Sequence, residues 1–140
     1  MKKLILTTLI TVLTSCSFYD TIKHNYHEIK DRLISWSDIF IQEEDTYLVY
    51  FYSERCGHCN ELKQDILSYY FKEITPMYFI CTDIEIVTGP PKDLLGISDI
   101  NEFYIFGTPF LTLIKDGTVA DYYVGKVQIL DFISIWLKFN

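Results

Sequence analysis

The sequence predicts an α/β domain with a central mixed β-sheet flanked by helices, and three observations lead to this class. Two apolar runs, 47–52 and 77–81, enclose a stretch with helical periodicity, which is the pattern of a strand–helix–strand crossover between parallel strands. Two further apolar runs, 110–114 and 119–124, flank Asp116-Gly117, a strong signal for an antiparallel hairpin. The chain ends on a stretch with one apolar helical face, which is expected to cover the sheet.

The first fifteen residues have the pattern of a secretory signal peptide. Lys2 and Lys3 precede ten apolar or weakly polar residues, Leu4 to Leu13, and a bilayer-spanning helix needs about twenty. The next residues, Leu13-Thr14-Ser15-Cys16, resemble the lipobox of bacterial lipoproteins, in which the cysteine is lipidated and becomes the mature N-terminus. We therefore expect residues 1–15 to be removed and Cys16 to carry a lipid anchor. An incidental cysteine in an ordinary or uncleaved leader remains the alternative; under both interpretations the domain lies outside the cytoplasm.

The length and charge of the chain limit the possible partners. A chain of 140 residues with 49% hydrophobic residues is long enough for one domain with a real core. The formal charge is −7, and removing Lys2 and Lys3 leaves 10 basic residues against 19 acidic ones, a balance of −9. This balance argues against nucleic acid as a partner and against electrostatic adhesion to anionic lipid. We expect contact with the membrane only through the lipid anchor.

Residues 16–35 are expected to form a tether between the lipid and a domain at 36–140. The tether is polar and charged, with some helical spacing in its second half, where Ile29, Leu33, Trp36 and Phe40 recur. In the domain, the run 47–52 is continuously apolar and should be a strand buried on both faces.

The remaining elements follow in order. A helix after the first strand is predicted by Leu62, Ile66 and Tyr69 or Tyr70, and it should end before Pro76. The segment 84–107 has no clear period apart from a loop signal at Gly89-Pro90-Pro91. The last helix is predicted by four apolar residues on one face, namely Ile129, Phe132, Ile133 and Trp136.

The candidate active site is Cys56-Gly57-His58-Cys59, which lies between the first strand and its helix. Two thiols at this spacing can form a reversible disulfide, and the positive end of the helix favours a thiolate at the first one. A structural zinc site is the alternative, because Cys-x-x-Cys also binds metal. Zinc needs four ligands, and after lipidation of Cys16 only Cys81 and three histidines remain as further candidates, His58 being poorly placed. We expect no metal and no cofactor, with Cys81 an inert core thiol.

In its order of elements and motifs, the chain from Trp36 to Phe139 resembles the thioredoxin fold. The resemblance rests on the Cys-x-x-Cys motif after its strand, on Thr108-Pro109 directly before the hairpin, and on Gly125 sixteen residues after that proline. It implies that Cys56 is the exposed attacking thiol and Cys59 the buried resolving thiol. It also implies that Pro109 follows a cis peptide bond opposite the cysteines and that Thr108 offers backbone groups to an extended substrate. The implied substrates are protein thiols and disulfides; the redox partner is not identified.

Three departures from the family pattern affect the expected direction of the reaction. Tyr50 stands where reductases of the family bury an acid, and Arg55 replaces the usual tryptophan before the motif. Gly57 and His58 form the central dipeptide of protein disulfide isomerases. Arg55 and His58 should stabilise the thiolate, and therefore the reduced form, which makes the pair more oxidising.

These observations predict a membrane-anchored, extracytoplasmic thiol–disulfide oxidoreductase, with oxidase or isomerase activity favoured. An extracytoplasmic disulfide reductase is one alternative, and a redox-inert binding or accessory module on the same fold is another. Glu54 and Asp83 were candidates to replace the missing acid as a proton relay. Surface or strand-end positions are the expectation for both.

Overall fold

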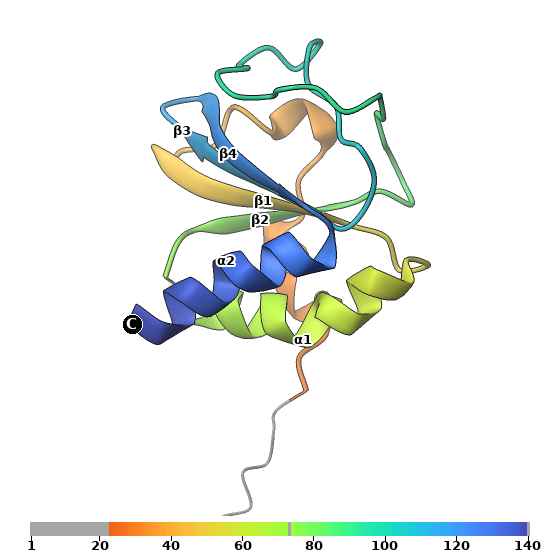
Figure 1. Ribbon diagram of the computed structural model, residues 1–140, viewed down its shortest axis with the longest axis vertical. Helices are drawn as coiled ribbons and strands as arrows, with labels where there is room; N and C mark the ends of the chain where they lie inside the picture. The colour runs from red at the N-terminus through yellow and green to blue at the C-terminus, as the bar shows by residue number, and fades with distance from the viewer. Residues whose placement is uncertain (1–22, 73, 140) are drawn as a thin grey trace, which may run out of the picture.

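The computed structural model describes residues 23–72 and 74–139 and contains a four-stranded sheet (Figure 1). In chain order the strands are β1 (Thr46–Tyr52), β2 (Met77–Cys81), β3 (Phe110–Lys115) and β4 (Thr118–Val124), and in space they run β2-β1-β3-β4. The helices are η1 (Tyr26–Arg32), η2 (Trp36–Asp38), α1 (Gly57–Phe71) and α2 (Gly125–Phe139), where η marks a 3-10 helix.

The strand β1 is central and pairs with neighbours of opposite sense. It is parallel to β2, with Tyr52 opposite Cys81, and antiparallel to β3, with Phe51 opposite Phe110. Six of its seven residues are buried, as the continuous apolar run predicted. The helix α1 supplies the crossover from β1 to β2, because parallel neighbours need a long connection. The mixed sheet predicted from the sequence is therefore confirmed.

The hairpin between β3 and β4 turns at the predicted Asp-Gly pair. Both turn residues have positive φ, 50° at Asp116 and 72° at Gly117. This backbone matches the twist of the flanking strands, and aspartate and glycine adopt it more readily than other residues. A register shift between Leu113 and Ile114 lies in β3, just before the turn.

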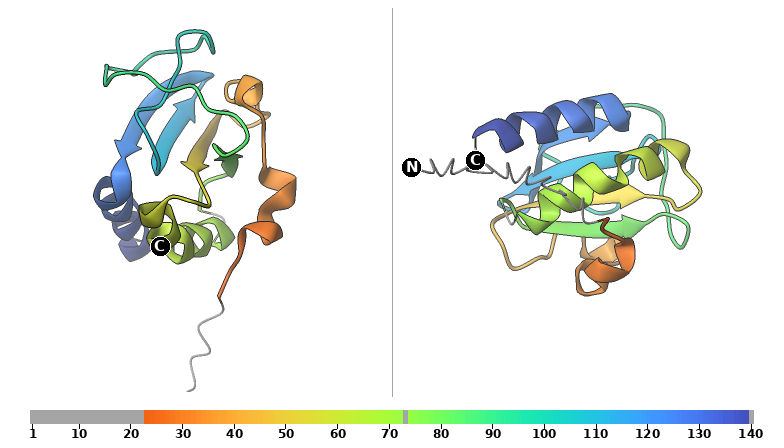
Figure 2. Two further views of the ribbon diagram at one scale, coloured as in Figure 1. Left: turned by 90° about the vertical axis from the view of Figure 1, so that its right-hand side faces the viewer. Right: turned by 90° about the horizontal axis from the view of Figure 1, so that it is seen from below.

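One face of the sheet is covered by α1 and α2, which lie side by side (Figure 1 and the right-hand view of Figure 2). The helix α1 buries Leu62 and Ile66 against this face, and α2 buries Ile129, Phe132 and Ile133. These are the residues whose spacing predicted the two helices. Trp136, placed on the same face of α2 by its spacing, is 41% exposed near the end of the helix.

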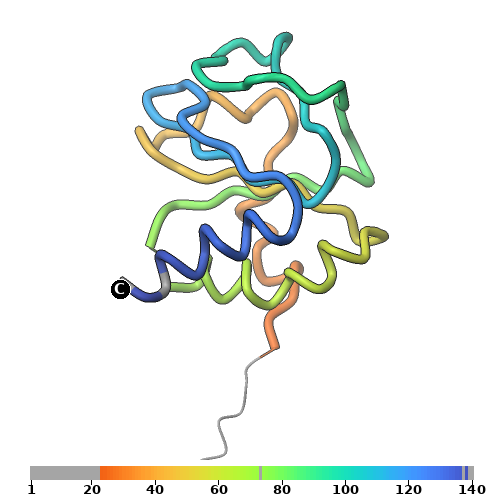
Figure 3. Tube along the Cα trace, in the orientation of Figure 1, coloured from red at the N-terminus to blue at the C-terminus, as the bar shows by residue number. Residues whose placement is uncertain are grey.

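The other face of the sheet is covered by η2 and by the chain between β2 and β3. This connecting segment, residues 82–109, forms no helix and passes over the sheet as an irregular strap (Figure 3). It buries Leu94, Phe103 and Ile105 against Phe51 and Phe110. The segment contacts the sheet only at these irregularly spaced positions. Its apolar residues therefore show no helical or strand period in the sequence.

The structure corrects the expectation of a tether for residues 23–35. Tyr26 and Ile29 of η1 are buried against the α1 face, and the Tyr26 ring stacks on Tyr52 with ring centroids 3.9 Å apart. A capping box at Asn25 and Glu28 fixes the start of η1. These two apolar side chains of the predicted tether therefore belong to the core of the domain. The signal peptide, residues 1–15, and Cys16 lie outside the described residues.

Within the described part of the chain, no helix has the length and apolar character required to cross a bilayer.

Candidate active site

The two cysteines of the motif form a disulfide at the junction of β1 and α1. Cys56 is the residue before α1 and is partly exposed, whereas Cys59 lies in the first turn and is fully buried. Their Cα atoms are 5.2 Å apart, within the ordinary range for a disulfide. A redox partner can therefore reach Cys56 from outside, while Cys59 is shielded by the α1 face of the core.

The strand-to-helix junction gives the Cys56 sulfur a polar environment. The backbone of Cys56 is extended, and its Sγ accepts a hydrogen bond from the backbone N–H of Cys59 at 3.2 Å. A side chain in this capping position satisfies an otherwise unpaired donor of the first turn. The same N–H and the helix dipole favour a negative sulfur when the disulfide is open. Gly57 opens the helix, and a Cβ built there would meet no atom within 4 Å.

Thr108 and Pro109 lie against the disulfide from the other side. The bond between them is cis, as the family resemblance implied, and the Thr108 carbonyl oxygen is 3.5 Å from the Cys56 sulfur. The Pro109 carbonyl accepts a hydrogen bond from the N–H of Gly125 at 2.9 Å, which ties this loop to the start of α2. Gly125 has a φ of 79°, a conformation that glycine adopts without steric strain. The family resemblance therefore identified Thr108 and Pro109, which the fold brings next to Cys56 although more than fifty positions separate them in the sequence.

Asp83 supports the loop that leads to the cysteines. It follows β2, and its carboxylate accepts hydrogen bonds from the Ser53 hydroxyl at 2.7 Å and the Glu54 backbone N–H at 2.8 Å. These bonds, followed by the charge of Arg55, hold the pKa of the Asp83 carboxyl below its ordinary value. The sequence predicted only a surface or strand-end position for Asp83, whereas the structure shows that it also holds the loop before Cys56. Because parallel strands end at the same edge of a sheet, the position after β2 was the available signal.

The two side chains expected to favour the thiolate both contact carboxylates. The Arg55 side chain is 83% exposed, and its Nε lies 3.3 Å from Asp83. His58 Nδ1 lies 3.4 Å from Glu61, which also forms an ion pair with Lys126 of α2. Lys126, followed by His58, holds the pKa of Glu61 below its ordinary value. These carboxylates offset part of the positive charge beside Cys56, so the helix terminus is the direct stabilising contact.

Tyr50, at the position of the family's buried acid, is fully buried on the α1 face of the sheet. Its hydroxyl and that of Tyr26 have no hydrogen-bond partner among the described residues. Burial raises the pKa of Tyr50 well above its ordinary value, so this phenol is neutral at physiological pH. The core beneath the disulfide therefore holds phenols at the position where reductases of the family bury a carboxyl.

Cys81 is a free, partly exposed thiol at the end of β2, opposite Tyr52. Burial is the main cause that raises its pKa, which makes the thiolate less accessible. Among residues 23–72 and 74–139, no three His, Cys, Asp or Glu side chains are grouped so that they could hold a metal ion.

Comparison with known proteins supports the fold. The sequence model of the Thioredoxin family matches residues 27–135. A thioredoxin from Nicotiana alata has a TM-score of 0.52 at 22% sequence identity, with 75% of this chain and 90% of that one covered. Thioredoxin f2 from Chlamydomonas reinhardtii has a TM-score of 0.49 at 11% identity, with 77% and 94% covered. No curated protein matches this chain.

The match over residues 27–135 and the Nicotiana structure confirm the predicted fold, a mixed four-stranded sheet flanked by helices. The match also begins before residue 36, in agreement with the packing of η1 against the sheet.

Proposed function

The chain belongs to the thioredoxin family, and on this basis we propose that it is an extracytoplasmic thiol–disulfide oxidoreductase that oxidises or isomerises protein disulfides. One observation carries the proposal: a partly exposed Cys56 is bonded to a buried Cys59 at a helix terminus and lies beside the Thr108 carbonyl. This arrangement gives one sulfur that substrates can reach and a second that they cannot.

In the oxidising direction, a substrate thiolate attacks Cys56 Sγ. The Cys56–Cys59 bond breaks, and Cys59 leaves with the electron pair and takes a proton. A second substrate thiolate then attacks the substrate sulfur of the mixed disulfide and releases Cys56 as a thiolate. Two electrons pass from the substrate to the cysteine pair. An isomerase starts from the reduced pair, with Cys56 attacking a substrate disulfide.

The peptide around the reacting cysteine would extend along Thr108. The Thr108 carbonyl is the acceptor shown beside the sulfur, and an extended substrate can donate a backbone N–H to such a group. Recognition through backbone atoms suits a protein that acts on many sequences.

The direction of the reaction is tested by the reduction potential of the pair. We expect a potential above the value of about −270 mV that is typical of thioredoxins and nearer about −180 mV, as in disulfide isomerases. His58→Pro and Arg55→Trp should each lower it, because each removes a side chain that is expected to stabilise the thiolate. Glu61→Gln should raise it, because it leaves His58 and Lys126 without their carboxylate. Equilibration of the purified full chain with glutathione measures the potentials of the wild type and the three variants.

Lys115→Gln is the matched control, because Lys115 pairs with Thr46 at the end of the sheet far from the disulfide. Its potential should equal that of the wild type. A wild-type potential at or below the thioredoxin value would favour the reductase instead. A protein without any reversible disulfide would leave only a redox-inert binding module.

We also propose that the protein is anchored to a bacterial membrane from outside the cytoplasm, on the pattern of Leu13-Thr14-Ser15-Cys16. Cys16→Ala should abolish lipid attachment and either release the protein from membranes or leave it unprocessed. Labelling of cells with a radioactive fatty acid measures this directly. Label that persists in the Cys16→Ala protein would remove the lipoprotein interpretation and leave the proposed redox chemistry untouched.

A further inference from the structure

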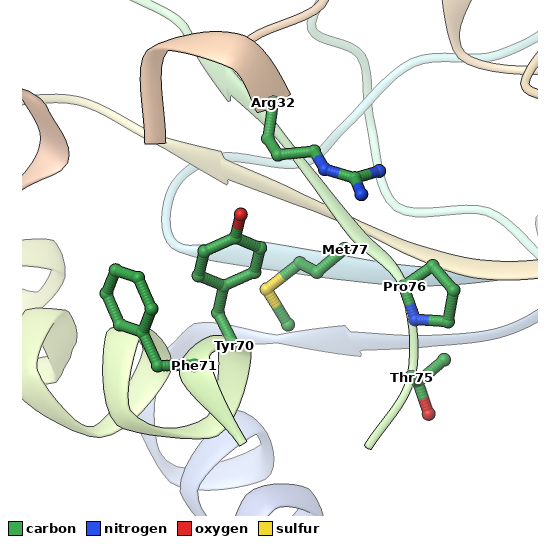
Figure 4. A pocket seen from close by; sticks show the side chains of 6 residues that line it. All are labelled: Arg32, Tyr70, Phe71, Thr75, Pro76 and Met77. Carbon is green, nitrogen blue, oxygen red and sulfur yellow. The ribbon is translucent and has the colours of Figure 1, made fainter. Parts of the chain in front are cut away.

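A pocket of about 380 Å³ lies at the end of α1 that is far from the disulfide (Figure 4). Its lining comes from three elements that the fold brings together: the end of η1, the end of α1, and the start of β2 with the residues before it. The lining residues are Arg32, Tyr70, Phe71, Thr75, Pro76 and Met77. Cavities of this size hold small organic molecules.

The guanidinium of Arg32 is only partly engaged by the protein. Nη1 lies 3.5 Å from Glu44, a long contact, and the Tyr78 ring lies beneath the guanidinium with its centroid 5.2 Å from Cζ. Glu44 is also bonded at 2.6 Å by the Tyr78 hydroxyl. Among residues 23–72 and 74–139, the long contact from Nη1 to Glu44 is the hydrogen bond that the Arg32 side chain makes. The flat group therefore lies over Tyr78 with donors left for a ligand.

A hydroxyl is the second hydrogen-bond donor of the pocket. Tyr70 turns its hydroxyl toward the side from which Arg32 enters (Figure 4). The Thr75 hydroxyl accepts a bond from Tyr69 at 3.3 Å and points away from Arg32 and Tyr70, so it supplies no donor to a ligand. Pro76 has no backbone N–H, and Met77 and the aromatic rings provide apolar surface between these donors.

A cationic fork, one hydroxyl donor and apolar walls match a ligand with an apolar body and one carboxylate. Guanidinium binds carboxylates in a two-pronged geometry that a lysine does not reproduce. We propose that this pocket is a second binding site, for a small aromatic or branched monocarboxylate. Its occupant does not reach the disulfide, because α1 has fifteen residues and separates the two sites by about 22 Å.

Benzoate is a suitable probe, with benzamide and acetate as analogues that lack the charge or the ring. On addition of benzoate to the purified full chain, NMR signals of the Met77 and Thr75 methyl groups should shift saturably. Benzamide and acetate should bind much more weakly. The oxidised and reduced proteins should bind benzoate alike, so the result does not depend on the proposed redox function.

Arg32→Gln should weaken benzoate binding about tenfold or more, since it removes a hydrogen-bonded charge. Tyr70→Phe removes one hydroxyl and should weaken binding by a smaller factor; it tests the site independently if the first variant is unstable. Lys30→Gln is the control, because it removes the same charge from an exposed residue of η1 outside the pocket. The proposal is wrong if benzoate gives no saturable shift, if benzamide binds equally, or if Lys30→Gln matches Arg32→Gln.

Discussion

Cys56→Ser should abolish thiol–disulfide exchange, whereas Cys59→Ser should accumulate mixed disulfides with substrate proteins. Cys56 is the sulfur that a partner can reach, at the helix terminus beside Thr108. In Cys59→Ser the Cys56 thiolate still attacks a substrate disulfide, but the second thiol that would release the adduct is gone. We expect the loss in Cys56→Ser to be complete within detection and the adducts of Cys59→Ser to disappear on addition of a reductant. Non-reducing gels of cell extracts, followed by blotting for this protein, measure both effects.

The free thiol provides the control for this experiment. Cys81→Ser should leave exchange unchanged and should not alter the adducts of Cys59→Ser, because Cys81 lies at the end of β2 outside the disulfide. Equal adducts in both single variants, or none in either, would refute the assignment of Cys56 as the attacking thiol. Adducts that disappear in Cys81→Ser would instead identify Cys81, at the end of β2, as the attacking thiol.

Phe51→Ala should destabilise the domain by about 3–5 kcal/mol, the usual loss for deleting a buried aromatic ring. Phe51 is fully buried in the central strand, and its ring meets those of Trp36, Phe103 and Phe110 at centroid distances of 5.6–5.9 Å. The cavity would lie between the sheet and the irregular strap, which has no helix to hold it in place. The free energy of unfolding of a whole domain is only about 5–15 kcal/mol, so this loss would remove a large part of it. Urea unfolding of the oxidised protein measures the change.

Ile41→Ala is the comparison for this prediction, because Ile41 is 71% exposed. Its effect should stay within about 0.5 kcal/mol. A loss below about 1 kcal/mol in Phe51→Ala would show that the strap refills the space, and that the aromatic cluster does not hold it to the sheet.

The pairing of charges around Cys56 changes how the site is expected to be tuned. From the sequence, Arg55 and His58 are expected to stabilise the thiolate directly. In the structure each has a carboxylate partner, Asp83 or Glu61, so each substitution acts on an ion pair. Both histidine and arginine side chains are largely exposed, where salt screens such pairs. The shifts in potential should therefore be larger at low ionic strength.

The sequence by itself determined the regular elements and the candidate pair of cysteines. Strand and helix periodicity is local, and it placed β1, β2, the hairpin and both long helices close to their observed positions. The Cys-x-x-Cys motif between a strand and a helix is also local, so Cys56 and Cys59 could be identified without coordinates. Thr108 and Pro109 came from the family resemblance, which supplied the long-range contact that spacing alone does not contain.

Only the tertiary structure decided which residues support that site. Asp83 bonds to the loop before the cysteines because β1 and β2 are parallel neighbours that end at one edge. Tyr26 and Ile29 fall in the predicted tether, because two apolar side chains in a polar, charged segment do not show locally that the sheet will cover them. The strap from 82 to 109 was unreadable for a related reason: its side chains fit the sheet at irregular intervals. Such packing depends on the shape of the sheet surface that the segment covers, and other parts of the chain form that surface.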